Sequence, residues 1–213
     1  MTDIIIDLET LGTRPGCPII EIGACAIDRT TGRITANFSR RVSGTYGYAD
    51  VRRVAEGRDC LGGIDSATAA WWTMDAGRDA TLRRILTRRY SPSADIDALI
   101  ALAEWCAAVR DFDAARVWGN GPTFDLAILA HAYEREHIPL PWHWYEERCV
   151  RTALELAGCE RGSVSWIERG PRHRALNDAR HEARKLYLSG ALGEVSMIAR
   201  RMRQRGTVKG VRA

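Results

Sequence analysis

The chain of 213 residues is 46% hydrophobic and 27% charged, and it carries a formal net charge of +4. This composition excludes a disordered or fibrous protein, no apolar run is long enough to cross a membrane, and the first residues do not resemble a secretory leader. We therefore expect a globular, cytoplasmic protein, whose six scattered cysteines are reduced thiols rather than a disulfide framework or a zinc site.

Three strands are expected first, because β-branched and apolar residues dominate three early runs that are separated by turn sequences. These runs cover residues 4–8, 19–27 and 34–42. The second separator, Asp28–Gly32, is a short polar turn that ends in glycine, which predicts an antiparallel hairpin between the second and third strands. Residues 43–63 show no sustained period, and we expect them to form a long loop.

Helical spacing of apolar residues dominates the rest of the chain. It predicts helices over residues 66–74, 79–88, 95–109, 124–136, 151–157, 175–188 and 194–205, with short strands at 115–119 and ending at Cys149. This order of elements predicts an α/β fold, with a mixed sheet flanked by helices. We expect one domain over residues 1–198, in which residues 43–115 form a helical and loop insertion.

The positive charge belongs to the end of the chain. Residues 199–213 hold six basic residues and no acids, whereas residues 1–198 hold 25 basic and 27 acidic residues. Such a basic tail attracts a polyanion through counterion release and electrostatic steering. Its alternative is a solvated terminus that aids solubility, and the sequence supports both interpretations equally.

Two carboxylates stand one residue apart at the end of the first apolar run, as Asp7 and Glu9 in Asp-Leu-Glu-Thr-Leu-Gly. Side chains at i and i+2 leave the same face of a strand, so both carboxylates project together while Leu8 turns into the core. Paired oxygen ligands of this kind suit a hard divalent cation.

Two further acids and a histidine stand in comparable settings. Asp125 follows Asn-Gly-Pro-Thr-Phe near a helix start, and Asp178 comes five residues after His173 in His-Arg-Ala-Leu-Asn-Asp. Each acid alone is explained as a helix cap or as a favourable charge at a helix N-terminus. Carboxylates at strand and helix ends also converge at one edge of an α/β sheet. The ordered set of four acids and a histidine favours this second interpretation, and with it an enzyme.

The three motifs resemble, in this order, those of the DEDD exonuclease superfamily in its histidine (DEDDh) branch. A tyrosine branch would need tyrosine directly after His173, where Arg174 stands. The Trp71-Trp72 pair and the sequence around residues 148–152 are most similar to ribonuclease T-like exoribonucleases of mycobacteria and to the phage exonuclease VIII type. Many relatives carry aspartate at the position of Arg151, which leaves its role open.

This resemblance implies a ribonuclease H-like fold and a metal-dependent 3′-5′ exonuclease that acts on the 3′ ends of single-stranded RNA or DNA with two Mg²⁺ or Mn²⁺ ions. By analogy, Asp7 would bridge both ions, while Glu9 and Asp178 complete one site. Asp125 would hold the other ion, and His173 would take a proton from the attacking water. Since relatives of this type are often homodimers, the resemblance also implies a homodimer.

The resemblance suggests substrate contacts as well. The stretch equivalent to Thr10 and Leu11 lines the pocket for the terminal nucleotide in the family, and Asn120 is a candidate for the same site. Trp71 and Trp72 cannot share one helix face. We therefore expect one of them in the core and the other, for which we select Trp72, to be a stacking platform for a base. A core role for both is the competing interpretation.

Two questions stay open at this point. RNA is slightly favoured over DNA, but the contact to the 2′-hydroxyl that separates them can be made by a backbone group. The competing function is a catalytically inactive nucleic-acid-binding module on the same fold. Retention of all four acids and His173 argues against this alternative.

Overall fold

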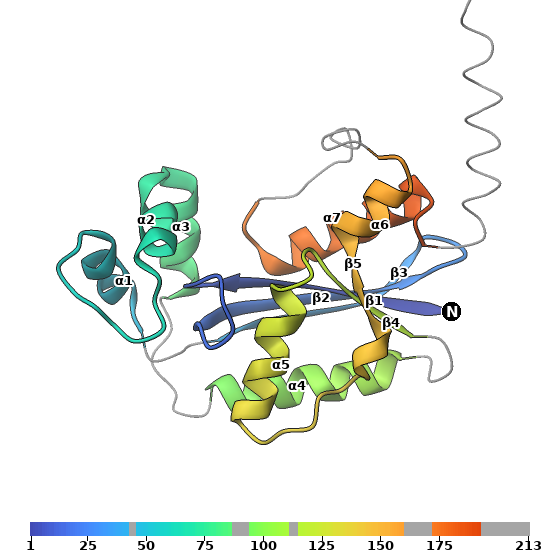
Figure 1. The fold of residues 1–213 in the computed structure, drawn as a ribbon, viewed down its shortest axis with the longest axis horizontal. Helices are drawn as coiled ribbons and strands as arrows, with labels where there is room; N and C mark the ends of the chain where they lie inside the picture. The colour runs from blue at the N-terminus through green and yellow to red at the C-terminus, as the bar shows by residue number, and fades with distance from the viewer. Residues whose placement is uncertain (43–45, 87–93, 111–114, 160–171, 193–213) are drawn as a thin grey trace, which may run out of the picture.

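The computed structural model describes residues 1–42, 46–86, 94–110, 115–159 and 172–192. A mixed five-stranded sheet in the order β3-β2-β1-β4-β5 forms the centre of the fold (Figure 1). The strands are β1 (Thr2–Thr10), β2 (Ile19–Asp28), β3 (Ile34–Arg41), β4 (Arg116–Gly119) and β5 (Glu147–Cys149). β1 is the central strand, antiparallel to β2 and parallel to β4. The predicted α/β class with a mixed sheet is confirmed, as is the hairpin of β2 and β3.

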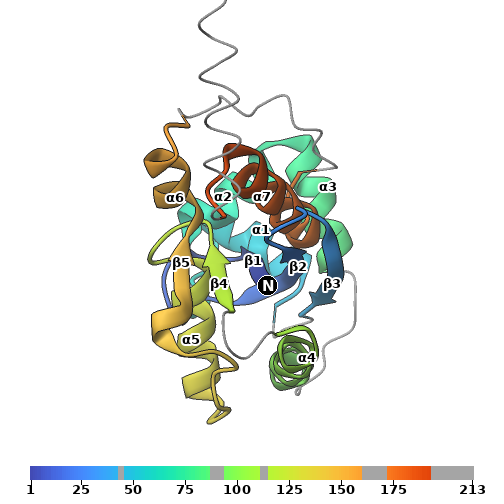
Figure 2. The ribbon, with the colours of Figure 1, turned by 90° about the vertical axis from the view of Figure 1, so that its right-hand side faces the viewer.

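Helices cover both faces of this sheet. They are α1 (Tyr48–Ala55), α2 (Ser66–Met74), α3 (Ala76–Ile85), α4 (Ala94–Val109), α5 (Asp125–Arg135), α6 (Val150–Leu156) and α7 (Ala175–Ser189), with a short 3₁₀ helix, η1 (Trp144–Glu146). Figures 1 and 2 show α4 and α5 on one face, α6 and α7 on the other, and α1 to α3 beside one end of the sheet. Of the segment 43–115, therefore, α4 packs on the sheet and α1 to α3 form a separate group.

The side-chain alternation of β1 divides its residues between two hydrophobic clusters. Ile4, Ile6 and Leu8 pack in the cluster beneath α4 and α5. Ile5 packs in the cluster beneath α6 and α7. Because residues two apart share a face, Asp7 and Glu9 lie on the side of the sheet that α7 covers.

The first turn of α7 lies directly against the backbone of β2. A Cβ atom placed on Gly23 would be 2.0 Å from the backbone nitrogen of Leu176 and 2.1 Å from the carbonyl carbon of Ala175. Gly23 is the residue paired with Asp7 in the β1-β2 ladder. The absence of a side chain at Gly23 therefore sets how closely α7 approaches the acidic end of β1.

A third hydrophobic cluster joins the end of the sheet to α1, α2 and α3. Leu11 and Ile20 pack there with Val51, Val54 and Trp72. The expectation of a loop over residues 43–63 is wrong for Tyr48–Ala55, which form α1. This helix buries only Val51 and Val54, too few residues for a period to be visible in the sequence, and a helix of eight residues depends on tertiary packing.

The other predicted elements are confirmed within a few residues. The largest shift is in α3, which begins at Ala76 because the Asp75 side chain accepts hydrogen bonds of 3.0 Å from the backbone N–H groups of both Gly77 and Arg78. The helix expected over residues 194–205 and the basic tail lie outside the described residues. Within the part of the chain that the structure describes, every helix is too short or too polar to span a bilayer.

Gly23→Ala is expected to lower the free energy of unfolding by about 3 kcal/mol, since the added methyl group meets backbone atoms that cannot move without displacing α7. Gly62→Ala is the matched control, because a Cβ at Gly62 meets no atom within 4 Å, and it should change stability by less than about 0.5 kcal/mol. Urea unfolding followed by circular dichroism measures both. Equal stability of the two variants would contradict the close contact.

Candidate active site

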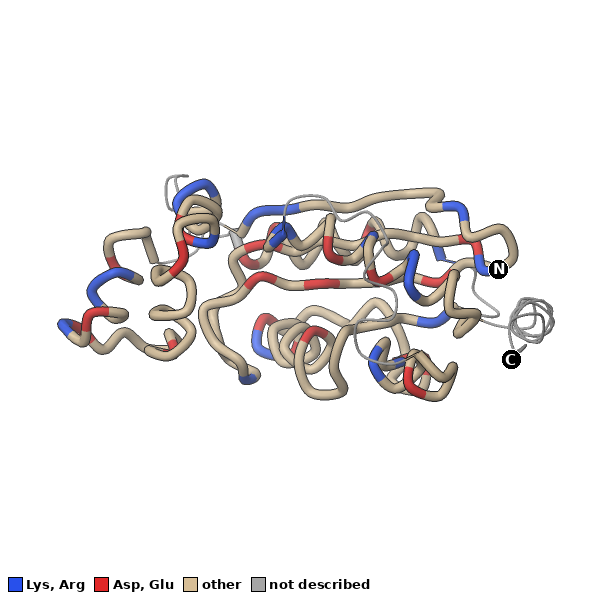
Figure 3. Tube along the Cα trace, turned by 90° about the horizontal axis from the view of Figure 1, so that it is seen from above, with Lys and Arg blue, Asp and Glu red and all other residues tan. Residues whose placement is uncertain are grey.

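The site begins with the carboxylates at the end of β1. Asp7 pairs with Gly23 and Glu9 with Glu21 across the β1-β2 ladder. Glu9 is buried, whereas Leu8 between them belongs to the opposite core. The expectation that Asp7 and Glu9 share one face of a strand is therefore met. In the view of Figure 3, acidic positions lie along the central strand of the sheet, with arginine and lysine positions spread over the surrounding elements.

Asp125 is held rigidly at the first residue of α5. It is buried, and its two carboxylate oxygens accept backbone hydrogen bonds from Leu8 (3.1 Å) and Asn120 (2.8 Å). These bonds connect the start of α5 to β1 and to the turn after β4. Arg151 donates from Nε to Asn120 Oδ1 at 3.3 Å, and its positive charge lowers the pKa of Asp125. The structure thus gives Arg151 a place beside the second acidic motif.

His173 and Asp178 approach Glu9 from the start of α7. Ligand atoms of Glu9, His173 and Asp178 all lie within 4.8 Å of one another. The backbone of His173 is in the left-handed region at φ 57°, which is unusual for a residue with a side chain. Its N–H donates to Asp178 Oδ2 at 3.0 Å, so the carboxylate of Asp178 also fixes the backbone that carries the imidazole.

Electrostatic repulsion links all four carboxylates. Burial, followed by the charges of Asp125, Glu9 and Asp178, raises the pKa of Asp7 well above its ordinary value. Burial, with Asp178 and Glu21 next, raises the pKa of Glu9 to about 9. Burial also raises the pKa of Asp125 to about 6, against the effect of its two backbone hydrogen bonds. So dense a set of buried acids resists ionisation without a cation.

The donor set fits a hard divalent cation. Carboxylate oxygens suit Mg²⁺ or Mn²⁺ better than a softer metal, which would favour imidazole or thiolate ligands. Two nearby arginines partly offset this repulsion. Arg84 lowers the pKa of Glu9, and Arg151 lowers the pKa of Asp125. Among the described residues, the groups that repel one another are therefore those expected to bind metal.

Two further acids belong to this environment, and the sequence analysis missed them. Glu21 is buried, lies opposite Glu9 in the ladder, and has Arg84 at 3.3 Å. Glu182 is buried, has Lys185 at 2.9 Å, and its charge contributes to the raised pKa of Asp7. The spacing of four residues between Asp178 and Glu182 was an available signal, because i and i+4 share a helix face. Glu21 was visible only as one acid within an apolar strand.

A pocket opens next to Glu9, between the end of β1 and α2. It encloses about 870 Å³ of empty volume, part of it open to solvent. Its lining residues are Leu8, Glu9, Thr10, Gly12, Thr13, Asp65, Ala67, Thr68, Trp71, Trp72 and Phe124. Of the predicted substrate contacts, Thr10 and Trp72 thus line this pocket.

The two tryptophans take unequal positions. Trp72, the residue that the sequence analysis selected as a stacking platform, is only 1% exposed, and its Nε1 donates to the carbonyl oxygen of Thr10 at 2.9 Å. Trp71 is 40% exposed. Leu11 is fully buried in the cluster with Trp72, so the apolar side chain expected against sugar and base lies in the core instead. Asn120 contacts Asp125 through its backbone and Arg151 through its side chain.

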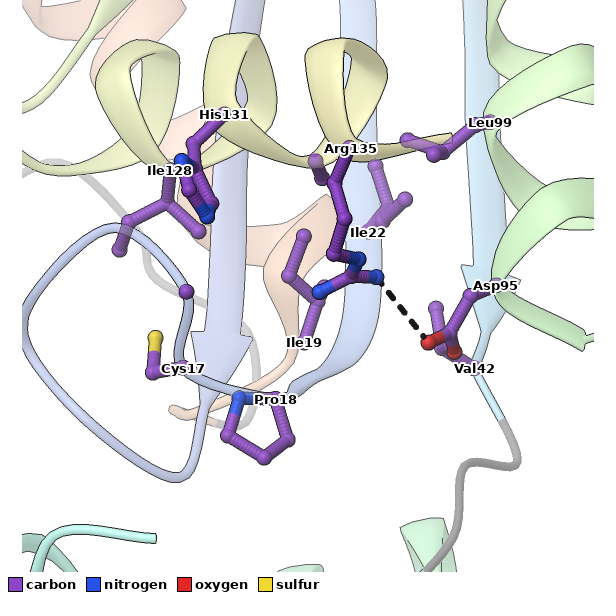
Figure 4. Close-up of a pocket in the computed structure, with 12 residues that line it drawn as sticks. Cys17, Pro18, Ile19, Ile22, Val42, Asp95, Leu99, Ile128, His131 and Arg135 are labelled. Atoms are coloured by element: carbon purple, nitrogen blue, oxygen red, sulfur yellow. Dashed lines mark ion pairs between the residues drawn. The ribbon is translucent and has the colours of Figure 1, made fainter. Parts of the chain in front are cut away.

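A second, smaller pocket lies on the other face of β1 and β2, toward α4 and α5 (Figure 4). Apolar residues such as Ile19, Ile22 and Leu99 line it, and its two charged residues, Asp95 and Arg135, pair with each other at 3.5 Å. The carboxylates of the candidate site are not among its lining residues. We therefore place the chemistry at the pocket beside Glu9.

The model of the 3′-5′ exoribonuclease Rv2179c-like domain matches residues 2–188. No curated protein matches the sequence. The nuclease domain of 3′hExo, described as a DEDDh family member and solved bound to rAMP, is similar over 96% of this chain and 92% of that chain, with 14% identity and a TM-score of 0.51.

Two other solved structures share the fold. Cell-death related nuclease 4 (CRN-4) is similar over 90% of this chain and 64% of that chain, with 12% identity and a TM-score of 0.58. Exonuclease I is similar over 93% of this chain and 45% of that chain, with 14% identity and a TM-score of 0.51. The fold is therefore the ribonuclease H-like fold of DEDDh nucleases, and this chain spans less than half of the exonuclease I chain.

The metal-free protein is expected to lose stability as the pH rises from about 5 to 9. The folded pKa is about 9 for Glu9 and about 6 for Asp125, whereas both carboxyls titrate near pH 4 in an unfolded chain. Between these values the folded state binds more protons, so the free energy of unfolding falls with rising pH, by up to about 1.4 kcal/mol per pH unit for each of the two groups. Mn²⁺ is expected to bind the ionised folded form and thereby to restore the lost stability.

Urea titrations at several pH values, with EDTA or with Mn²⁺, measure this effect. Glu9→Gln should flatten the pH dependence of the metal-free protein, because the amide does not titrate. A stability that rises with pH in EDTA and does not respond to Mn²⁺ would contradict the assignment of the acidic cluster.

Proposed function

We propose that this chain is a metal-dependent exonuclease that releases nucleoside monophosphates from the 3′ end of single-stranded nucleic acid. The premise is that the chain belongs to the family of the 3′-5′ exoribonuclease Rv2179c-like domain. The observation that carries the proposal is the meeting of Glu9, His173 and Asp178, whose ligand atoms lie within 4.8 Å of one another. These residues come from two segments more than 160 positions apart.

In this proposal the four carboxylates would hold two Mg²⁺ or Mn²⁺ ions. Asp7 would contribute to both sites, Glu9 and Asp178 to one of them, and Asp125 to the other. The raised pKa values of Asp7, Glu9 and Asp125 support the assignment, because positive charge at this position would remove the cost of ionising buried acids. The ions, when bound, supply positive charge beside the attacking and leaving oxygens of the phosphodiester.

His173 is assigned as the general base. An imidazole accepts a proton readily near neutral pH, and a base must lie within hydrogen-bond reach of the water that it activates. The assignment is supported by the N–H of His173, which donates to Asp178 Oδ2. This bond holds the backbone that carries the imidazole beside a carboxylate assigned to the metal site.

The terminal nucleotide is assigned to the pocket beside Glu9. Thr10 and Phe124 contribute to its wall, and the half-buried ring of Phe124 offers an aromatic surface to a base. Trp72 is assigned an indirect part, since its bond to the carbonyl oxygen of Thr10 fixes the end of β1. RNA is the proposed preferred substrate over DNA, because the family is described by exoribonuclease activity.

Asp7→Ala is expected to reduce nucleotide release by on the order of 10³-fold or more, as for other groups that stabilise transition-state charge. The fold should remain intact, because the substitution removes one of several mutually repelling acids. End-labelled RNA and DNA, single- and double-stranded, incubated with Mg²⁺ or Mn²⁺ give the rate, and the product ladder reports polarity and sugar preference. Glu134→Ala, at an exposed acid of α5, is the control, and unchanged turnover of Asp7→Ala would refute the proposal.

His173→Ala is expected to slow hydrolysis by about 10²- to 10⁴-fold, the range for a general base, while single-strand binding in EDTA changes only a few-fold. Fluorescence anisotropy with a labelled single strand measures binding separately from cleavage. His137→Ala is the matched control, because His137 is exposed and also has a left-handed backbone, at φ 55°. Equal losses of rate and affinity in His173→Ala would contradict the role of a base.

A further inference from the structure

The imidazole of His173 lies against two indole rings of α2. Its ring centroid is 4.9 Å from that of Trp71 at an interplanar angle of 88°, and 5.9 Å from that of Trp72 at 74°. Both are edge-to-face contacts, an arrangement that aromatic rings prefer. The two indoles are themselves edge-to-face, with centroids 5.1 Å apart. The proposed base is therefore one member of a three-ring cluster formed by Trp71, Trp72 and His173.

The cluster is anchored at two points. Trp72 is bonded through Nε1 to the carbonyl oxygen of Thr10, which ties it to β1. Trp71 carries the guanidinium group of Arg78 over its ring, with 4.4 Å between the guanidinium carbon and the ring centroid. Arg78 lies in the first turn of α3, where its N–H donates to the Asp75 side chain at 3.0 Å. The indole of Trp71 is thus held between α3 and the imidazole.

The backbone of His173 does not fix its ring by itself. The hydrogen bond from its N–H to Asp178 determines where the main chain runs, but the side-chain torsions can still direct the ring toward or away from Glu9. The contact with Trp71 restricts these torsions. It comes from α2, a helix that carries none of the four acids.

We propose that Trp71 is a positioning residue that keeps the imidazole of His173 directed at Glu9 and Asp178, with Arg78 bracing the indole from its other side. This inference rests on the proposed function of His173. The guanidinium of Arg78 and the ring of His173 already contact the indole of Trp71, so in this proposal we assign Trp71 to the imidazole rather than to the terminal base. The contact with the terminal nucleobase is assigned to Phe124 instead.

Trp71→Ala is expected to lower kcat by about 10- to 100-fold, the cost of misplacing a catalytic group by about 1 Å, with little change in KM. Trp71→Phe keeps an aromatic edge and should recover most of the rate, and Arg78→Ala should give a smaller loss of the same kind. Trp144→Ala is the matched control, because Trp144 is 80% exposed on η1, and it should leave kcat and KM unchanged.

A double-mutant cycle separates the roles. If Trp71 acts through His173, then Trp71→Ala causes no further loss in a His173→Ala background. A loss that persists there, together with a raised KM, identifies Trp71 as a base platform and overturns the inference. Should Trp71→Ala not fold, Arg78→Ala takes its place in the cycle, because its smaller loss should likewise disappear in the His173→Ala background.

A measurement without activity completes the test. In histidine-ring NMR spectra of the metal-free protein, the ring-proton signal of His173, assigned by its loss in His173→Ala, should be shifted by the indole ring currents. Trp71→Ala should move this signal and leave the other four histidines unchanged; an unmoved signal overturns the inference. If the wild-type protein releases no nucleotides, or if His173→Ala turns over normally, the proposed function fails while the NMR result still reports the contact.

Discussion

The contact between the first turn of α7 and the backbone of β2 determines where the acidic side chains meet. Gly23 leaves room for the backbone of Ala175 and Leu176. The fully buried residues Ala179 and Ala183 continue the close packing along the helix. Because Gly23 is the ladder partner of Asp7, the helix that carries Asp178 and Glu182 is brought onto the face of the sheet from which Asp7 and Glu9 project.

The same strand, β1, also contains a buried acid whose role is structural. Asp3 lies on the same face of β1 as Asp7 and is fully buried. Arg29 donates to one of its oxygens at 3.1 Å, and Trp118 donates to the other at 3.0 Å. Such partners replace the hydrogen bonds with water that a buried carboxylate loses. At the other end of β1, the neighbours of Asp7 are further acids, which raise its pKa. Within one strand, therefore, Asp3 has the partners of a structural acid, whereas Asp7 has the acidic neighbours expected of the proposed metal site.

The sequence predicted those parts of the fold and the site that depend on local pattern. The period of two in β1 placed Asp7 and Glu9 on one face, and the apolar spacing gave α2, α4, α5 and α7 to within a residue or so. What it could not predict depends on contacts between distant segments. Val51 and Val54 of α1 can be recognised as core residues only from their packing in the third hydrophobic cluster. The burial of Trp72 rather than Trp71 depends on the position of Thr10. The four acids were identified through ordered motifs, whereas Glu21 and Glu182 follow from register and helix packing.

The group of α1, α2 and α3 stands beside the sheet, yet it contacts the candidate site at two points. One is β1, where Trp72 binds the carbonyl oxygen of Thr10 and the N–H of Asp65 donates to the carbonyl oxygen of Leu11 at 2.8 Å. The other is the residue before α7, where the two indoles contact His173. A displacement of this group would therefore move the end of β1 and the imidazole together. Since a positioned base tolerates little misplacement, the proposed role of His173 would make the geometry of the reaction depend on helices that contribute no carboxylate to the site.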